Sequence, residues 1–259
     1  LLPGSKSLTG YGDRLQVDVD VAAMFRVAQA EINTAGKHRK LLFSWYAGLI
    51  SHYCADKYLH PYVESFVGAH AGSNASLHGQ CETEIDIALY HKQIGKPISA
   101  FRTGFLRLNA EETQAIAEVW RKIIASLFHE TVSLSQITSA VAAIPVLTFL
   151  QLHGTSFTKP IAKAVSGLIP GGYDLSTKLK RDHPCAGILN EERRAWRDPR
   201  HPEGLYRHSV EDILLHAAGE AHALISMAYH GESAADSLLI TRDFDFGYYA
   251  GEEEVLHVG

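Results

Sequence analysis

The chain has 259 residues, of which 46% are hydrophobic and 20% are charged, and its formal net charge is −5. This composition is typical of a globular protein that is long enough to bury a sizeable core. The acidic balance lacks the positive footprint of a nucleic-acid-binding protein, so a nucleic-acid partner is not expected.

The three cysteines, Cys54, Cys81 and Cys185, are too few for a disulfide framework and leave one thiol over. This number favours a reducing compartment. Residues 1–4 are neither basic nor part of a long apolar run, so no signal peptide is visible and a cytoplasmic location is the default expectation. We interpret Cys54 and Cys81 as small buried residues and not as metal ligands.

Residues 1–20 are rich in glycine, serine and aspartate, and we expect them to form a loop. Apolar residues at helical spacing then predict helices in the segments 21–35, 41–59, 109–128, 137–152, 157–168 and 209–229. A further helix is predicted between the second and the third of these, capped by Asn74 or Ser76 and ending at about residue 91. The segments 61–77, 97–107 and 173–208 are predicted to be irregular. No linker or internal repeat divides the chain, so the sequence predicts a single all-α, multi-helix domain over residues 1–259.

Prolines set the expected character of two of these helices. The helix over 41–59 is apolar on almost every side, which is typical of a helix in the interior, and Pro61 disfavours helical geometry at His60. The segment 137–152 is too short and too polar to span a bilayer, so we predict a buried core helix kinked near Pro145 and no transmembrane segment.

The last predicted helix begins at Ser209, and Asp212 three residues later gives a capping-box-like arrangement. His216 and Glu220 lie four residues apart on this helix, beside apolar residues. We interpret them as a buried, hydrogen-bonded pair and not as ligands.

Two segments carry imidazole and carboxylate side chains at every fourth residue. These residues are His52, Asp56 and His60 in HYCADKYLHPY, and His78, Glu82 and Asp86 in HGQCETEID. Four residues turn an α-helix by about 400°, so each set forms a stripe along one side of its helix. Alternatively, these are ordinary polar residues that merely recur at helical spacing.

If the two stripes face each other, their carboxylates lie close together and need a compensating cation. Imidazole nitrogen together with carboxylate oxygen favours Zn²⁺, whereas Mg²⁺ and Ca²⁺ prefer oxygen ligands. Catalytic zinc usually has three protein ligands and an open position. The sequence therefore predicts interior helices that bind zinc.

The same two segments resemble the zinc-dependent phospholipase C family, in particular its little-characterised bacterial branch. The similarity lies in the patterns H-x-x-x-D-x-x-x-H-P-Y and H-x-x-x-E-x-x-x-D between residues 45 and 95. A weaker similarity lies in NEERRAWRDP at residues 190–199, where Trp196 is either an aromatic anchor or a wall of the substrate cleft. The nuclease branch of the same fold uses a related pattern.

The resemblance implies a role for each residue of the two stripes. His52 and Asp56 would bind one metal ion, with Asp56 placed to bridge to a neighbour. A second, more closed site would be completed by His60, His78 and Glu82. Asp86 would act in the second shell, holding a ligand imidazole in the correct tautomer. Because the family's general base is an upstream Asp, the resemblance offers Asp13 as a distant candidate for it and leaves the catalytic residues unknown. The resemblance implies one to three zinc ions.

The implied activity is zinc-dependent hydrolysis of a phosphodiester, with a phospholipid-like substrate. The family's full trinuclear site takes further ligands from upstream, but no histidine precedes His38, which fits an N-terminally incomplete domain. Two alternatives stay open: a single-strand nuclease of the same fold, and a non-catalytic protein that the metal stabilises. The sequence leaves the oligomeric state open.

Overall fold

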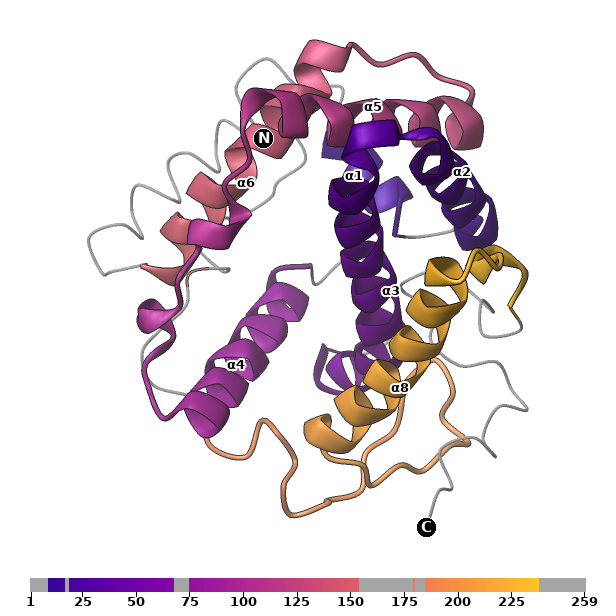
Figure 1. The fold of residues 1–259 in the computed structure, drawn as a ribbon. Helices are drawn as coiled ribbons and strands as arrows, with labels where there is room; N and C mark the ends of the chain where they lie inside the picture. Colours follow the sequence, from indigo (N-terminus) through magenta and orange to yellow (C-terminus); the bar gives the residue numbers. More distant parts are fainter. Residues whose placement is uncertain (1–8, 17–18, 68–74, 154–178, 180–184, 238–259) are drawn as a thin grey trace. The chain divides into compact units, whose positions relative to one another are not determined.

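The computed structural model describes residues 9–16, 19–67, 75–153, 179 and 185–237. This part of the chain is mostly helical and contains no strand beyond an isolated antiparallel bridge between Trp196 and Tyr206. The predicted all-α class is therefore confirmed (Figure 1). The predicted helix over 157–168 lies outside the described residues.

The chain divides into two compact units. Unit 1 consists of Leu1–Tyr58, Arg107–Ala143 and Leu214–Gly247, and unit 2 consists of Leu59–Leu106, Ile144–Ile213 and Tyr248–Gly259. Three helices, α3, α6 and α8, contribute residues to both units. This division does not test the single-domain prediction, which stays a prediction.

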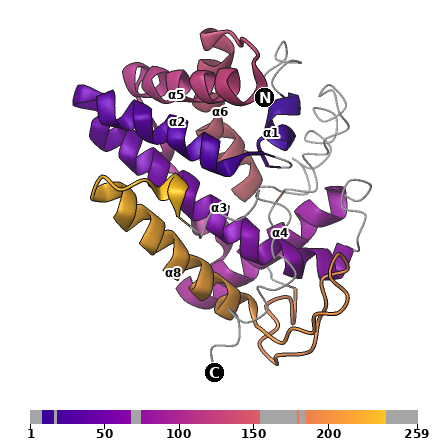
Figure 2. The same ribbon diagram turned by 90° about the vertical axis from the view of Figure 1, so that its right-hand side faces the viewer.

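In unit 1, α2 (Val21–Thr34) packs against α5 (Ala110–Phe128) (Figure 2). The side chain of Asp20 caps α2, and Asn109 forms a capping box with Glu112 at the start of α5. Each cap satisfies backbone N–H groups that the first helical turn leaves without intrahelical partners. Both helices were predicted, because their apolar residues recur on one face.

The short helix α1 (Thr9–Arg14) lies where a loop was expected. Tyr11 and Arg14 both bond the carboxylate of Glu130, and their side chains also pack against the ring of Phe128. These partners are more than a hundred residues away, so a local reading of the sequence could not include them.

The longest described helix, α3 (Arg39–Val67), follows a single 3₁₀ turn, η1 (Gly36–His38). The prediction that the helix ends near His60 is wrong, because α3 continues through Pro61 to Val67, for about two more turns. Proline removes one backbone hydrogen bond and its ring crowds the carbonyl four residues earlier. Here Tyr62, Val63 and Glu64 are buried, so tertiary packing holds the residues after Pro61 in the helix.

In unit 2, α4 (Ala75–Ile94) is followed by the 3₁₀ turns η3 (Ile98–Ala100) and η4 (Gly104–Leu106). Ile87 of α4 packs with Ile98 and with Leu152, and Tyr90 and Phe101 cover this small core. Because α4 starts at Ala75, Ser76 lies inside the helix and is not its cap, while Asn74 lies outside the described residues.

The helix α6 (Leu134–Leu152) is not the buried core helix that was predicted. Only Ile137, Val141 and Leu152 are buried, whereas Val146 and Phe149 are exposed. Apolar composition suggested burial, but composition does not say which surfaces find a partner. By length and composition, α6 is the one described helix that could cross a membrane. The expectation of no transmembrane segment stays a prediction.

The helix α8 (Val210–Tyr229) begins as predicted. Ser209 Oγ accepts from the Asp212 backbone N–H, and the Asp212 carboxylate accepts from the Ser209 backbone N–H and hydroxyl. After α8, the turn η6 (Ala234–Asp236) packs on α2 in unit 1, and Gln29 donates a hydrogen bond to the carbonyl of Glu232.

Candidate metal centre

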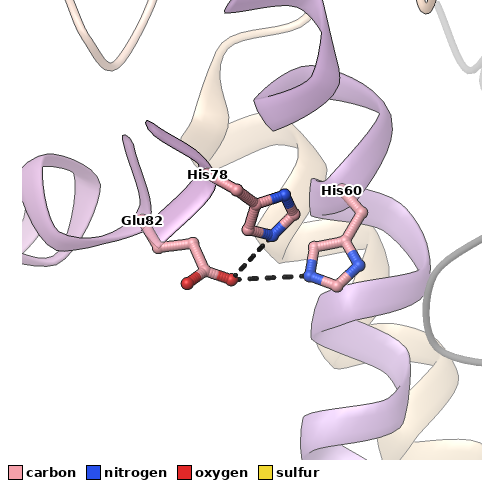
Figure 3. Close-up of side chains that lie close together, drawn as sticks. All are labelled: His60, His78 and Glu82. Atoms are coloured by element: carbon pink, nitrogen blue, oxygen red, sulfur yellow. Dashed lines mark hydrogen bonds and ion pairs between the residues drawn. The ribbon is translucent and has the colours of Figure 1, made fainter. Parts of the chain in front are cut away.

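The last two turns of α3 and the first half of α4 bring three potential ligands together in unit 2. His60 comes from α3, and His78 and Glu82 come from successive turns of α4 (Figure 3). One ligand atom from each residue lies within 4.8 Å of the other two. These are the three residues that were expected to form the more closed metal site.

Two of the distances within this cluster are close to those between the ligand atoms of a tetrahedral metal ion. Oε1 of Glu82 lies 3.1 Å from Nε2 of His78 and 3.5 Å from Nε2 of His60. Zinc bonds of roughly 2.0–2.1 Å at the tetrahedral angle separate neighbouring ligand atoms by about 3.3 Å. Both imidazoles direct Nε2 at the same carboxylate oxygen, as Figure 3 shows. The three residues therefore form a group that could hold a metal ion.

Glu64 is a fourth member of the cluster, and it was not predicted. Its side chain is fully buried, and its Oε1 lies 2.9 Å from Nδ1 of His78. The second carboxylate oxygen, Oε2, is buried and has no hydrogen-bond partner among the described residues. Because the helix was expected to end near His60, Glu64 was assigned to a loop. The spacing of four residues between His60 and Glu64 could have indicated that Glu64 lies on the same side of the helix as His60.

The cluster has a closed side and an open side. The side chains of Glu64 and His60 are 0% and 8% exposed, whereas that of Glu82 is 32% exposed. The rings of His60 and His78 lie edge to face, with centroids 4.8 Å apart. Of the three potential ligands, Glu82 is therefore the most exposed to solvent.

The position of His78 between two carboxylates strongly changes its acidity. Burial alone lowers the pKa of the ring, but its hydrogen bonds to Glu64 and Glu82 and the negative charge of Glu82 together raise this pKa to about 9. At neutral pH the ring therefore carries a proton on both nitrogens when no metal is bound. One of these two protons occupies Nε2, the atom that faces the other two potential ligands.

The other predicted ligands, His52 and Asp56, form a separate pair on α3. His52 Nε2 lies 3.3 Å from Asp56 Oδ2, and the His52 side chain is half exposed. The two units divide α3 between Tyr58 and Leu59, so this pair belongs to unit 1 and the cluster belongs to unit 2. A metal ion held by His52 and Asp56 stays a prediction.

Asp86 lies one turn beyond Glu82 on α4 and is exposed. Its predicted role in holding a ligand imidazole stays a prediction. The carboxylate that does lie against the second ring nitrogen of His78 is that of Glu64.

The two helical cysteines are buried, as predicted. Burial, followed by the nearby carboxylate of Glu220, raises the pKa of the Cys54 thiol to about 12. Burial, followed by the charge of Glu82, likewise raises the pKa of the Cys81 thiol to about 12. The interpretation that neither residue is a ligand stays a prediction.

In unit 1, Glu220 is buried, and two of its partners were not predicted. Its carboxylate accepts from the ammonium group of Lys57 at 3.1 Å and from the hydroxyl of Tyr58. His216 is half-buried, and its ring lies edge to face with that of Tyr58. The sequence placed Lys57 on an apolar helix, which was the available signal for a buried acidic partner.

Trp196, in the segment with the weaker family similarity, is an aromatic anchor in unit 2. Its ring stacks on Tyr206 and meets Tyr62 edge to face, and its indole N–H donates to the carbonyl of His208. The side chain of Asn190 bonds the backbone of Arg194 and His208. This segment therefore packs against α3 at Tyr62, which lies two residues after His60.

Comparisons with protein-family models, with curated proteins and with solved structures find no match to this chain.

Proposed function

We propose that the protein is a zinc-dependent phosphodiester hydrolase with a phospholipid-like substrate, and that His60, His78 and Glu82 hold a zinc ion. The observation that carries the proposal is the convergence of two imidazole nitrogens on one carboxylate oxygen at 3.1 and 3.5 Å. Two nitrogen donors and one oxygen donor form a ligand set found in catalytic zinc sites.

Three protein ligands support a catalytic site better than a closed structural one. Structural zinc sites are almost always filled by four protein ligands, whereas catalytic sites keep one position for water or substrate. The partial exposure of Glu82 supports an open position on that side of the cluster. When bound, zinc would supply a water of lowered pKa and a positive charge for a phosphoryl oxygen.

The residues around the proposed ligands would orient the ligand side chains and exclude water from one side of the site. Burial of His60 and Glu64 excludes water from the side of the site away from Glu82. In a water-poor site, the electrostatic interactions with a phosphodiester are stronger than in bulk water. The choice of a phospholipid-like substrate rests on the family resemblance of residues 45–95, and the net charge of −5 gives no support to nucleic acid.

One observation favours a second candidate, a non-catalytic protein that the metal stabilises. Among the described residues, one group of three ligands is close enough to hold an ion, whereas the family resemblance implies a larger cluster. A single site that joins α3 to α4 would be sufficient to stabilise unit 2.

An assay with two substrates separates these candidates. Zinc-loaded protein is incubated with para-nitrophenyl phosphorylcholine and with single-stranded DNA, and a Glu82→Ala variant serves as the control for contaminating activity. Hydrolysis of the choline ester that Glu82→Ala lacks is the expected result. Cleavage of DNA alone would identify a nuclease, and no turnover by zinc-loaded protein would favour the non-catalytic role.

A further inference from the structure

We propose that Glu64 is the positioning residue of the metal site: its carboxylate accepts a hydrogen bond from Nδ1–H of His78 and thereby makes Nε2 the nitrogen that binds the metal. This inference rests on the proposed metal site and adds to it a residue that the sequence patterns did not include. Glu64 acts through His78 and need not contact the metal.

The geometry of the pair supports this assignment. Glu64 Oε1 lies 2.9 Å from Nδ1 of His78, a normal hydrogen-bond distance. Nε2 of the same ring faces Glu82, 3.1 Å away. A carboxylate cannot donate when it is ionised, so the ring must donate from Nδ1. The nitrogen on the other side of the ring is then the one that can take a metal.

Burial explains why the choice of tautomer would be firm. The Glu64 side chain is fully buried, so water does not compete for the Nδ1 proton. A buried carboxylate also needs a compensating positive charge nearby, because burying an isolated charge is strongly unfavourable. A metal-bound imidazole that donates to Glu64 provides that charge. Mutation of a carboxylate that holds a ligand histidine in this way typically lowers the metal affinity by roughly 10–100-fold.

The location of Glu64 on α3 also affects how α3 and α4 are joined. Glu64 lies four residues after His60, so the same side of one helix supplies a ligand to the metal and an anchor for a ligand from α4. Binding of the metal would therefore fix the relative position of α4 and the last turns of α3 through two links.

The test compares the zinc affinities of the wild-type protein and the variants Glu64→Gln and Glu64→Asp, measured by competition with a chromophoric chelator. Glu64→Gln keeps the shape but removes the charge, and its affinity should fall by roughly 10–100-fold. Glu64→Asp keeps the charge on a shorter side chain and should lie between the two. Asp198→Asn is the matched control, because Asp198 is also buried in unit 2 but pairs with Arg200. The zinc affinity of Asp198→Asn should equal that of the wild-type protein.

A metal-independent measurement keeps this inference separate from the proposed function. In ¹⁵N spectra of the metal-free wild type, Nδ1 of His78 should carry a strongly hydrogen-bonded proton, and Glu64→Gln should change this signal while Asp198→Asn leaves it unaltered. Unchanged affinity and an unchanged Nδ1 signal in Glu64→Gln would overturn the role of Glu64 while the metal site stands. A wild-type protein that binds no zinc would overturn both the metal site and this role.

Discussion

At the scale of single residues, the placement of His78 between Glu64 and Glu82 couples metal binding to proton binding. The metal-free ring is protonated at neutral pH, because its pKa is raised to about 9. Zinc must displace the Nε2 proton, so the metal and the proton compete for one atom.

The first prediction follows from this competition. Zinc affinity should rise by roughly tenfold per pH unit between about pH 6 and about pH 8, because at least one proton leaves for each zinc ion that binds. Titration calorimetry in two buffers of different ionisation enthalpy measures the released proton directly. Zinc binding that is independent of pH and releases no proton would contradict the placement of His78 in the site.

The residues of the candidate site could be predicted in part from the sequence. The spacing of four residues indicated two stripes of potential ligands, and the family resemblance implied the group of His60, His78 and Glu82, which lie together in the structure. The spacing could not show Glu64, because its carboxylate meets His78 only if the helix passes through Pro61. Lys57 and Glu220 were missed as a pair for a related reason: their contact joins positions that are 163 residues apart.

At the scale of the elements, the buried pair of Lys57 and Glu220 links α3 to α8 within unit 1. Their side chains are 3% and 4% exposed. A second prediction is that Glu220→Ala destabilises the protein by about 3–5 kcal/mol, because it leaves the Lys57 ammonium buried without its counter-charge.

A double variant provides the control for this pair. Replacing both residues by apolar ones, Lys57→Met with Glu220→Leu, removes both charges together and should destabilise the protein much less than Glu220→Ala alone. Chemical denaturation of wild type, Lys57→Met, Glu220→Leu and the double variant measures the coupling, and Glu220→Ala is measured beside them. A double variant as unstable as the single one would show that the charges do not depend on each other.

The third prediction concerns the start of α8. Asp212→Ala removes the acceptor of the Ser209 backbone N–H and should lower the free energy of unfolding by about 1 kcal/mol. Burial alone raises the pKa of Asp212, but hydrogen bonds from Ser209 and the charge of Arg193 outweigh it and hold this pKa below its usual range. The stabilisation is therefore complete above about pH 4 and is lost as the pH falls through the lowered pKa.

Denaturation curves at several acidic pH values test this dependence. The difference between wild type and Asp212→Ala should shrink below about pH 4, where the carboxylate becomes protonated in both the folded and the unfolded chain. Glu211→Ala is the control, because Glu211 carries the same charge in the same turn and instead pairs with Lys92. A difference that is constant with pH would contradict the role of the ionised cap.

The helices themselves were largely predictable, and the exceptions have physical causes. Segments with a clear apolar face, such as α2 and α5, were predicted to within about two residues, which is the usual uncertainty of a helix end. The continuation of α3 past Pro61 depends on the burial of Tyr62, Val63 and Glu64, which local preferences do not contain. The exposure of α6 could not be predicted, because an apolar sequence does not specify its partners.

At the scale of the whole molecule, the metal should contribute to stability. Glu64 is a carboxylate in a buried position, and the proposed ligand His78 lies against it. A metal that binds only the folded state adds about 4 kcal/mol when its free concentration is roughly a thousand times the dissociation constant. The fourth prediction is that a chelator lowers the melting temperature at neutral pH and that added zinc restores it.

Thermal melts of wild type and of His78→Ala, each with and without chelator, test this contribution. His78→Ala should melt at the same temperature in both conditions, because it has lost the site that the chelator empties. An equal effect of chelator on both proteins would mean that the metal stabilises the chain from somewhere else.

The central claim is that His60, His78 and Glu82 hold zinc, and zinc content tests it most directly. Protein expressed with added zinc is dialysed and its metal is measured by elemental analysis, for wild type, His78→Ala, Glu82→Ala and the control His91→Ala. His91 lies in the last turn of the same helix and outside the cluster. We predict that wild type and His91→Ala retain stoichiometric zinc and that both cluster variants retain less. Equal zinc content in all four proteins would contradict the claim.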